Sequence, residues 1–288
     1  MRITTSLEYQ NLGANINTSL EALTTVQSQI SSGKQLQTFS DDPAGAAQAL
    51  VLRSALGDNA QYQRNATAAT TFLTASEGAL SSATSVVNSM RQVAVEGANS
   101  TQTPDSLAAL GDQVDGAIQQ LTQEANTQVQ GRYLFGGTNT TTAPYDSTQT
   151  YQGNTSAINS QLGPNSSVQI NTIGSTAFGP AFTALQSLKA DLAAGDATAI
   201  SGDIGKVDTA LSALDGASAT AGSKANLATA ATAQLTRVQS EYQSADSDIE
   251  NVDLAQAAVQ LQSATNVYQA SLAATAKAFQ YSLSDFLH

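Results

Sequence analysis

Hydrophobic residues recur at alternating spacings of three and four along much of this chain. Such spacing places one apolar seam along a helix that packs against a partner helix. The first seam comprises Tyr9, Leu12, Ile16, Ser19, Leu23, Val26 and Ile30. Two further seams comprise Leu73, Ser76, Leu80, Ala83, Val87, Met90 and Ala94, and then Leu107, Leu110, Val114, Ala117 and Leu121. The polar stretch 99–106, which contains Pro104, predicts a short link between these last two helices.

A joint is predicted between the first helix and the second. Gly33 suits the left-handed position just past a helix end, because it has no side chain to clash there. Asp42 can accept backbone N–H bonds as an N-cap, and Pro43 has its φ preset for a first helical turn. The stretch 31–50 is therefore expected to end one helix and start another.

The middle of the chain has a different pattern. Residues 131–180 are rich in Gly, Asn, Thr and Ser, and Val168, Ile170 and Thr172 alternate with polar neighbours as in a strand. We expect Gly131 to end a helix, followed by a short strand and a Gly-Gly turn. The region is predicted to be a small β-rich insert with loops rather than a second core.

Helical patterns return after Phe182. The glycines of residues 182–216 predict short elements at first. A clean seam then comprises Leu235, Val238, Tyr242, Ala245, Ile249 and Val252, and a second seam in a different phase comprises Leu254, Ala258, Leu261, Thr265, Tyr268, Leu272, Thr275 and Phe279. One straight helix cannot present both seams to one partner, so a break is expected at 251–255.

These patterns predict a mainly α fold, in which the N- and C-terminal segments form long helical hairpins or a coiled coil around a small β-rich insert in the middle of the chain. Three regions are expected: a terminal coiled-coil domain from residues 1–38 and 253–288, a helical domain from 39–132 and 181–252, and the insert at 133–180. Hydrophobic residues make up 41% of the chain, but aromatic residues make up only 5% and tryptophan is absent. Burial must therefore come from thin, closely packed helices.

The distribution of charge limits the kinds of partner that the chain can bind. The net charge of −12 argues against binding to nucleic acid or to anionic lipid. The segment 254–288 has only Lys277 and Asp285 as charged side chains, so its outward face suits packing among copies better than exposure to water. An intramolecular bundle without partners would explain the inner seams. It explains the pair formed by the charge-poor C-terminal segment and the N-terminal segment less well. We interpret the following residues as an assembly seam: Leu12, Ile16, Leu23, Val26, Ile30, Leu254, Leu261, Tyr268, Leu272 and Phe279.

Five stretches of the chain resemble the flagellin superfamily, and within it the proteins of the hook–filament junction. They are "MRITT" at 1–5, "ISSGK" at 30–34, "SDDPAGAAQAL" at 40–50, "GRYLFGGT" at 131–138 and "YQASLAATAKAFQYSLSDFL" at 268–287. The Ser-Ser-Gly and Asp-Asp-Pro-Ala-Gly elements are shared with flagellins. "MRIT" and "GRYLFGG" are similar to the junction proteins instead.

The resemblance implies a structural adaptor that joins the flagellar hook to the flagellin filament. Its implied partners are copies of itself in a ring, the first hook–filament junction protein, flagellin, and a cytoplasmic export chaperone that binds the C-terminal helix. It also implies an extracellular, flagellar location, reached through the type III apparatus without a cleaved signal peptide; neither a signal sequence nor a spanning segment is visible. By the same resemblance the terminal seams form an inner tube and the insert faces outward. The alternatives are a flagellin that forms the filament itself and, more distantly, an unrelated helical protein secreted by a type III system.

Enzymatic or metal chemistry is not expected. Cysteine is absent, and the only histidine, His288, is the last residue, where a frayed terminus is the favoured interpretation. Asp246, Asp248 and Glu250 imitate the start of a calcium loop, but Asn251 and Ala257 stand where its Gly and its bidentate Glu belong. These acidic residues are interpreted as a solvated helix face. We therefore predict no catalytic, cofactor-binding or metal-binding residues.

Overall fold

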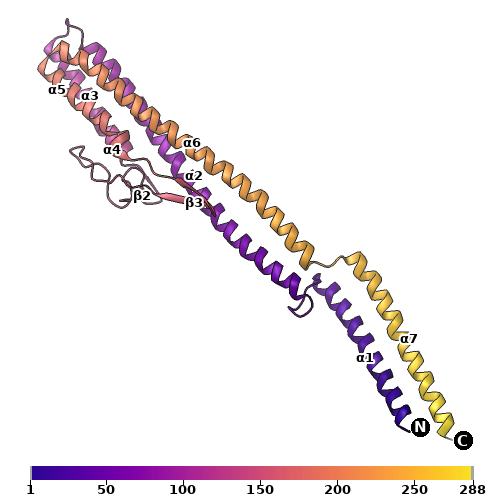
Figure 1. The fold of residues 1–288 in the computed structure, drawn as a ribbon. Helices are drawn as coiled ribbons and strands as arrows, with labels where there is room; N and C mark the ends of the chain where they lie inside the picture. Colours follow the sequence, from indigo (N-terminus) through magenta and orange to yellow (C-terminus); the bar gives the residue numbers. More distant parts are fainter. Residues whose placement is uncertain (1, 287–288) are drawn as a thin grey trace. The chain divides into compact units, whose positions relative to one another are not determined.

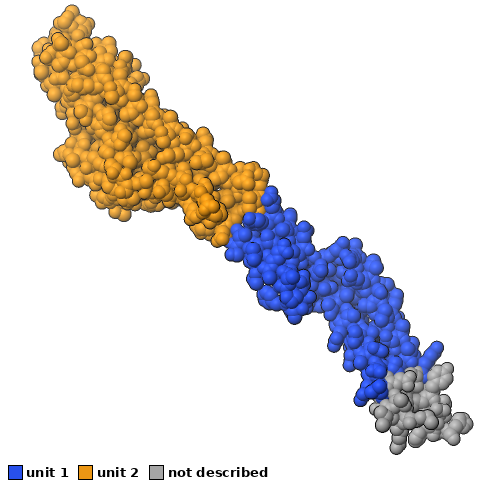
Figure 2. All heavy atoms as spheres, in the orientation of Figure 1, with its two compact units in different colours: residues 1–57, 239–288 blue, residues 58–238 orange. Residues whose placement is uncertain are grey.

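The computed structural model describes residues 2–286, which form two compact units. One unit consists of residues 1–57 and 239–288, and the other of residues 58–238 (Figure 2). We call them the terminal unit and the inner unit. Two long helices, α2 (Pro43–Gly97) and α6 (Ala197–Glu250), contribute residues to both.

Two paired helices dominate the terminal unit. Helix α1 (Arg2–Ser32) and helix α7 (Leu254–Phe286) lie side by side and run antiparallel, so that the start of α1 and the end of α7 lie at the same end of the pair (Figure 1). The predicted pairing of the N- and C-terminal segments is thus confirmed. The expected break at 251–255 is also present, because α6 ends at Glu250 and α7 begins at Leu254.

Within the inner unit, α2 and α6 run antiparallel in one fixed register. The Asn59 side-chain amide donates to the carbonyl of Leu235 at 3.0 Å, and the Thr84 hydroxyl donates to Asp215 at 3.2 Å. As the residue number rises on α2, that of its partner on α6 falls, which defines an antiparallel pair. Helix α3 (Pro104–Ala125) packs against α5 (Gly179–Ala194), and the short α4 (Gly174–Ala177) precedes α5.

The core of the inner unit confirms the predicted seam of α2. All seven seam positions from Leu73 to Ala94 are buried. A second buried row was not predicted and comprises Phe72, Ala79, Val86 and Val93, one heptad apart. These side chains are buried because α2 contributes to a core with further layers and not only to a pair of helices.

Among the described residues the strands form two small antiparallel pairs, as expected for an insert without its own large core, and the other β-bridges are isolated. Strand β1 (Gln128–Val129) pairs with β2 (Arg132–Tyr133), and β3 (Asn159–Gly163) pairs with β4 (Ser166–Gln169). The prediction that Gly131 ends a helix is wrong. Helix α3 already ends at Ala125, and Gly131 at φ 74° follows Gln130 at φ 52° in the turn between β1 and β2. Two successive positive φ values match the twist of a tight hairpin, which explains the glycine.

An aromatic cluster fixes the insert to the helices. The rings of Phe135 and Phe178 pack edge to face with centroids 4.8 Å apart, and those of Tyr145 and Phe182 lie 4.6 Å apart. The buried Tyr145 hydroxyl donates to the carbonyl of Gly174 at 2.9 Å, and burial raises the pKa of this tyrosine. A side chain at Gly174 would collide with the Phe135 carbonyl, so glycine is required for this close approach.

The expectation of short elements after Phe182 holds for α5 but fails for α6, which runs for 54 residues. Helix α6 includes four glycines, each of which costs a helix about 1 kcal/mol relative to alanine. A buried row along α6 offsets this cost and comprises Ile200, Val207, Ala210, Leu214, Ala221, Ala225 and Ala228. Burial on tertiary contact thus overrides local propensity in this helix.

Candidate assembly surface and helix joint

The contact between α1 and α7 uses half-buried side chains. On α1 the half-buried positions are Leu12, Ile16, Ser19, Leu23, Val26, Gln29 and Ile30. On α7 the contact positions are the buried Ala257 and the half-buried Leu261, Ala264, Thr265, Tyr268, Ser271 and Thr275. The hydroxyls of Ser19 and Ser271 approach to 3.4 Å across the pair. Mostly small side chains on α7 therefore face mostly large apolar side chains on α1, and two helices alone leave this seam only half-buried.

The structure places the proposed seam residues in two groups. Leu12, Ile16, Leu23, Val26 and Ile30 on α1 and Leu261 and Tyr268 on α7 are half-buried. Leu254 and Leu272 are instead exposed, by 60% and 42%. The side chain of Phe279 lies outside the described residues, as do those of His288 and Tyr9. The role of these residues in assembly stays a prediction.

Exposed apolar side chains concentrate in the terminal unit. Of the eleven large hydrophobic side chains that are exposed in the described part of the chain, nine belong to this unit. They are Leu7, Leu20, Phe39, Leu50, Val51, Leu254, Val259, Val267 and Leu272. Concentration of apolar surface in one region is typical of protein–protein interaction sites. None of the described helices is long and apolar enough to span a membrane.

The joint after α1 is built by a glycine and two neighbouring aspartates. Gly33, at φ 71°, closes α1, and its N–H donates to the Gln29 carbonyl. Pro43 begins α2, and the Asp42 carboxylate accepts from the N–H of Ala44 at 3.1 Å. Asp41 was not singled out from the sequence. Its carboxylate accepts the backbone N–H groups of Thr38 and Gln37 at 2.7 and 3.1 Å, and these bonds lower its pKa.

The joint is tied by backbone bonds to the break between α6 and α7. Lys34 and Asn251 form an antiparallel β-bridge. On one side of the bridge the N–H of Gln35 donates to the Glu250 carbonyl at 2.7 Å, and on the other the N–H of Val252 donates to the Gly33 carbonyl at 3.1 Å. The two helix interruptions, far apart in sequence, are thus one local structure.

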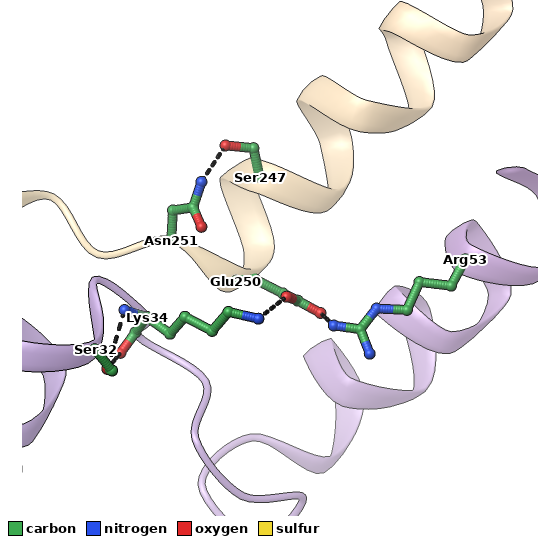
Figure 3. A network of polar contacts seen from close by, with 6 residues as sticks. All are labelled: Ser32, Lys34, Arg53, Ser247, Glu250 and Asn251. Atoms are coloured by element: carbon green, nitrogen blue, oxygen red, sulfur yellow. Dashed lines mark hydrogen bonds and ion pairs between the residues drawn. The ribbon is translucent and has the colours of Figure 1, made fainter.

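A buried carboxylate anchors this structure. The Glu250 side chain is 10% exposed and lies between Lys34, whose Nζ is 3.0 Å away, and the Arg53 guanidinium (Figure 3). Lys34 and Arg53 are themselves about half exposed. The interpretation of Glu250 as part of a solvated helix face is therefore wrong. Its partners come from the other end of the chain, and spacing within one helix carries no signal for them.

A groove of about 430 Å³ lies beside this ion pair. Its apolar lining includes Leu36, Phe39, Ala46, Ala49 and Leu50, and its polar lining includes Lys34, Arg53 and Glu250. Phe39 is 67% exposed. Among the described residues, no group of three or more His, Asp or Glu side chains is arranged to hold a metal ion. The groove thus combines an apolar wall with one buried ion-paired carboxylate.

The fold and this site define a class of protein. It is a mainly helical chain whose first and last helices pair with each other. The two helix interruptions that follow them are joined by backbone bonds, and the inner helical unit contains a small β insert. Comparison with family models is consistent with this class. Residues 3–140 match the bacterial flagellin N-terminal helical region, and residues 204–287 match the bacterial flagellin C-terminal helical region. The chain belongs to the flagellin superfamily.

Individual relatives agree with this assignment. The chain is 33% identical to the flagellar hook-associated protein 3 of Salmonella typhimurium over 180 residues, which are 62% of this chain and 57% of that protein. It is 29% identical to a flagellin of Halalkalibacterium halodurans over 125 residues, 42% of this chain and 44% of that flagellin. The aligned part thus spans little more than half the length of the hook-associated relative.

The fold is similar to that of a solved structure. The crystal structure of FlgL from Bacillus cereus matches with a TM-score of 0.62 and 22% sequence identity, over 68% of this chain and 99% of that one. At this level of identity the likeness concerns the fold. It agrees with the long helices and the small insert of the present chain.

Proposed function

We propose that this protein is a structural adaptor that joins the bacterial flagellar hook to the flagellin filament. The observation that carries the proposal is the composition of the terminal unit. It contains a pair of helices of the flagellin type and nine of the eleven large apolar side chains that are exposed among the described residues. A chain with such a surface is suited to packing among copies and neighbours. The role is one of binding and shape, and no catalytic step is part of it.

The hook-associated relative supports the junction rather than the filament. It aligns over 62% of this chain, whereas the flagellin aligns over 42% at lower identity. The motifs at 1–5 and 131–138 favour the same choice. A flagellin that polymerises along the filament is the second candidate, because the matching helical regions are those of flagellins.

The proposed partners follow from the adaptor role. They are further copies of this chain in a ring, the first hook–filament junction protein on one side and flagellin on the other. The proposed location is extracellular, on the flagellum, after export through the flagellar type III apparatus. During export a cytoplasmic chaperone would cover the exposed face of α7, where Val259 and Val267 are 71% and 52% exposed.

Immunogold labelling of intact flagella with antibody to this chain tests the proposal. One narrow band between hook and filament is the expected result, since an adaptor occupies one place along the axis. Label along the whole filament would favour the flagellin alternative. Absence of label from flagella that carry a labelled flagellin control would overturn both.

A further inference from the structure

The inner unit contains a buried carboxylate that has no role in the proposed assembly. Asp203, on α6, has a side chain that is fully buried. One of its oxygens accepts from Lys206 Nζ at 2.7 Å, but the other, Oδ2, has no hydrogen-bond donor among the described residues. A buried carboxylate oxygen without a donor is costly, so its surroundings need an account.

Helix geometry places a second carboxyl group beside this oxygen. The Lys206 ammonium also donates to the Ser187 hydroxyl of α5 at 2.7 Å. Helix α5 ends at Ala194 and α6 begins at Ala197, so the two helices run antiparallel past this contact. Asp191 follows Ser187 by one helical turn, and Asp203 precedes Lys206 by three residues, which brings Asp191 level with Asp203. Asp191 is half-buried. Two carboxyl groups in such proximity cannot both ionise without cost, and a proton on one of them converts an acceptor into a donor.

We propose that Asp191 and Asp203 share one proton at mildly acidic pH values at which exposed aspartates are ionised, with Asp191 donating to Oδ2 of Asp203. The proton supplies the donor that the buried oxygen lacks. The pair then forms a pH-sensitive contact between α5 and α6, independent of the terminal unit.

The charges around the pair support this assignment of the proton. The hydrogen bond that a protonated Asp191 would donate to Asp203 raises the pKa of Asp191, as do its partial burial and the negative charges of Asp203 and Asp196, while Lys206 acts in the opposite direction. From α3, Asp115 is already paired with Lys189 of α5 at 2.5 Å. A carboxyl whose pKa is raised on folding contributes stability that is present at acidic pH and is lost as the pH rises through its folded-state pKa. The α5–α6 contact should therefore weaken as the pH rises from the ordinary range of aspartate through the raised pKa of Asp191.

Hydrogen exchange of the full chain tests the proposal, with rates corrected for the intrinsic effect of pH. The opening equilibrium of amides in 185–206 should rise with pH, by at most about tenfold per pH unit for one proton. Asp191→Asn should remove this dependence and keep protection high, because its amide donates permanently to Asp203. Asp112→Asn, a control for loss of one exposed carboxylate on α3, should leave the dependence unchanged.

A second measurement covers the case in which a variant perturbs folding. Carboxyl ¹³C shifts of the wild-type chain, labelled at aspartate, should show one group that titrates above the range of the exposed aspartates. Asp203→Asn should return Asp191 to that ordinary range. Titration of both groups within the ordinary range, or the same pH dependence in Asp191→Asn as in wild type, would overturn the proposal.

Discussion

The inner and terminal units use the same heptad spacing but bury it to different degrees. In the inner unit Leu73, Leu80 and Val87 are at most 1% exposed. In the terminal unit the seam residues of α1 are only half-buried, and Leu272 on α7 is 42% exposed. Spacing alone therefore determines which face of a helix is apolar. How many neighbours cover that face decides whether the chain supplies the whole core or leaves part of it to a partner.

The largest expected loss of stability comes from a substitution that creates a cavity in the core of the inner unit. Leu80→Ala should lower the opening free energy of the surrounding amides by ~2–5 kcal/mol, because the buried side chain leaves a space that the core fills incompletely. Leu23→Ala, at the half-buried seam of α1, should lower it by only about 1 kcal/mol in the isolated chain. Hydrogen exchange measures both variants. Equal losses would mean that the two seams are equally enclosed.

A smaller effect is expected at the tied joint of the terminal unit. Glu250→Gln should lower the local stability by ~1–2 kcal/mol, because a buried carboxylate loses its charge against two cations that are themselves half exposed. Amides of Gln35 and Val252 report the change. Asp248→Asn, at an exposed position two residues earlier, is the control and should have little effect. A loss no larger than that of the control would remove Glu250 as the anchor.

Two glycines of the terminal unit should respond in opposite directions to the same change. Gly33→Ala should cost about 1–2 kcal/mol, because φ is 71° and no atom lies near the added carbon, so backbone strain alone acts. Gly13→Ala, inside α1 and also in open space, should gain ~0.5–1 kcal/mol through helix propensity. Thermal unfolding followed by circular dichroism would reveal the signs. A gain or no change for Gly33→Ala would contradict the account of the joint, and a loss for Gly13→Ala would contradict the helix-propensity argument.

The smallest effect on the isolated chain is expected at Leu272, although its effect on assembly should be large. Leu272→Asp adds a charge at an exposed apolar position, so monomer helicity should stay within error while incorporation into flagella fails. Ser263→Asp adds the same charge about half a turn around α7 and is the control. Motility and labelling of flagella measure incorporation. Normal incorporation of Leu272→Asp would remove this residue from the assembly seam.

The fold was largely predictable because heptad spacing is a local property. The seam from Leu73 to Ala94, the link before α3, and the break before α7 all follow from residues close in sequence. The second buried row, with Phe72 and Val86, could not be predicted because it depends on which elements lie against α2. The continuous α6 was missed for a related reason, since tertiary burial outweighs the local cost of its glycines.

The joint was only partly predictable. Gly33, Asp42 and Pro43 have preferences that belong to single backbone positions, and these could be identified. Glu250 could not, because its partner Lys34 lies 216 residues away. Asp41 was passed over in favour of its neighbour, although an aspartate before a helix is equally suited to accept the N–H groups of the preceding loop. Of the two adjacent aspartates, Asp41 thus binds the preceding loop and Asp42 caps α2, and only the second role was predicted.

The β-bridge between Lys34 and Asn251 also has a consequence for the order of folding. A contact that closes a loop of this length carries a large entropic cost, which decreases once the intervening chain is already compact. We therefore expect the inner unit to form early and the terminal unit to form last, after nearly the entire chain is available. The same joint that ties the two ends together would thus make the exposed apolar surface a late product of folding, and a chain cut short before α7 would never complete it.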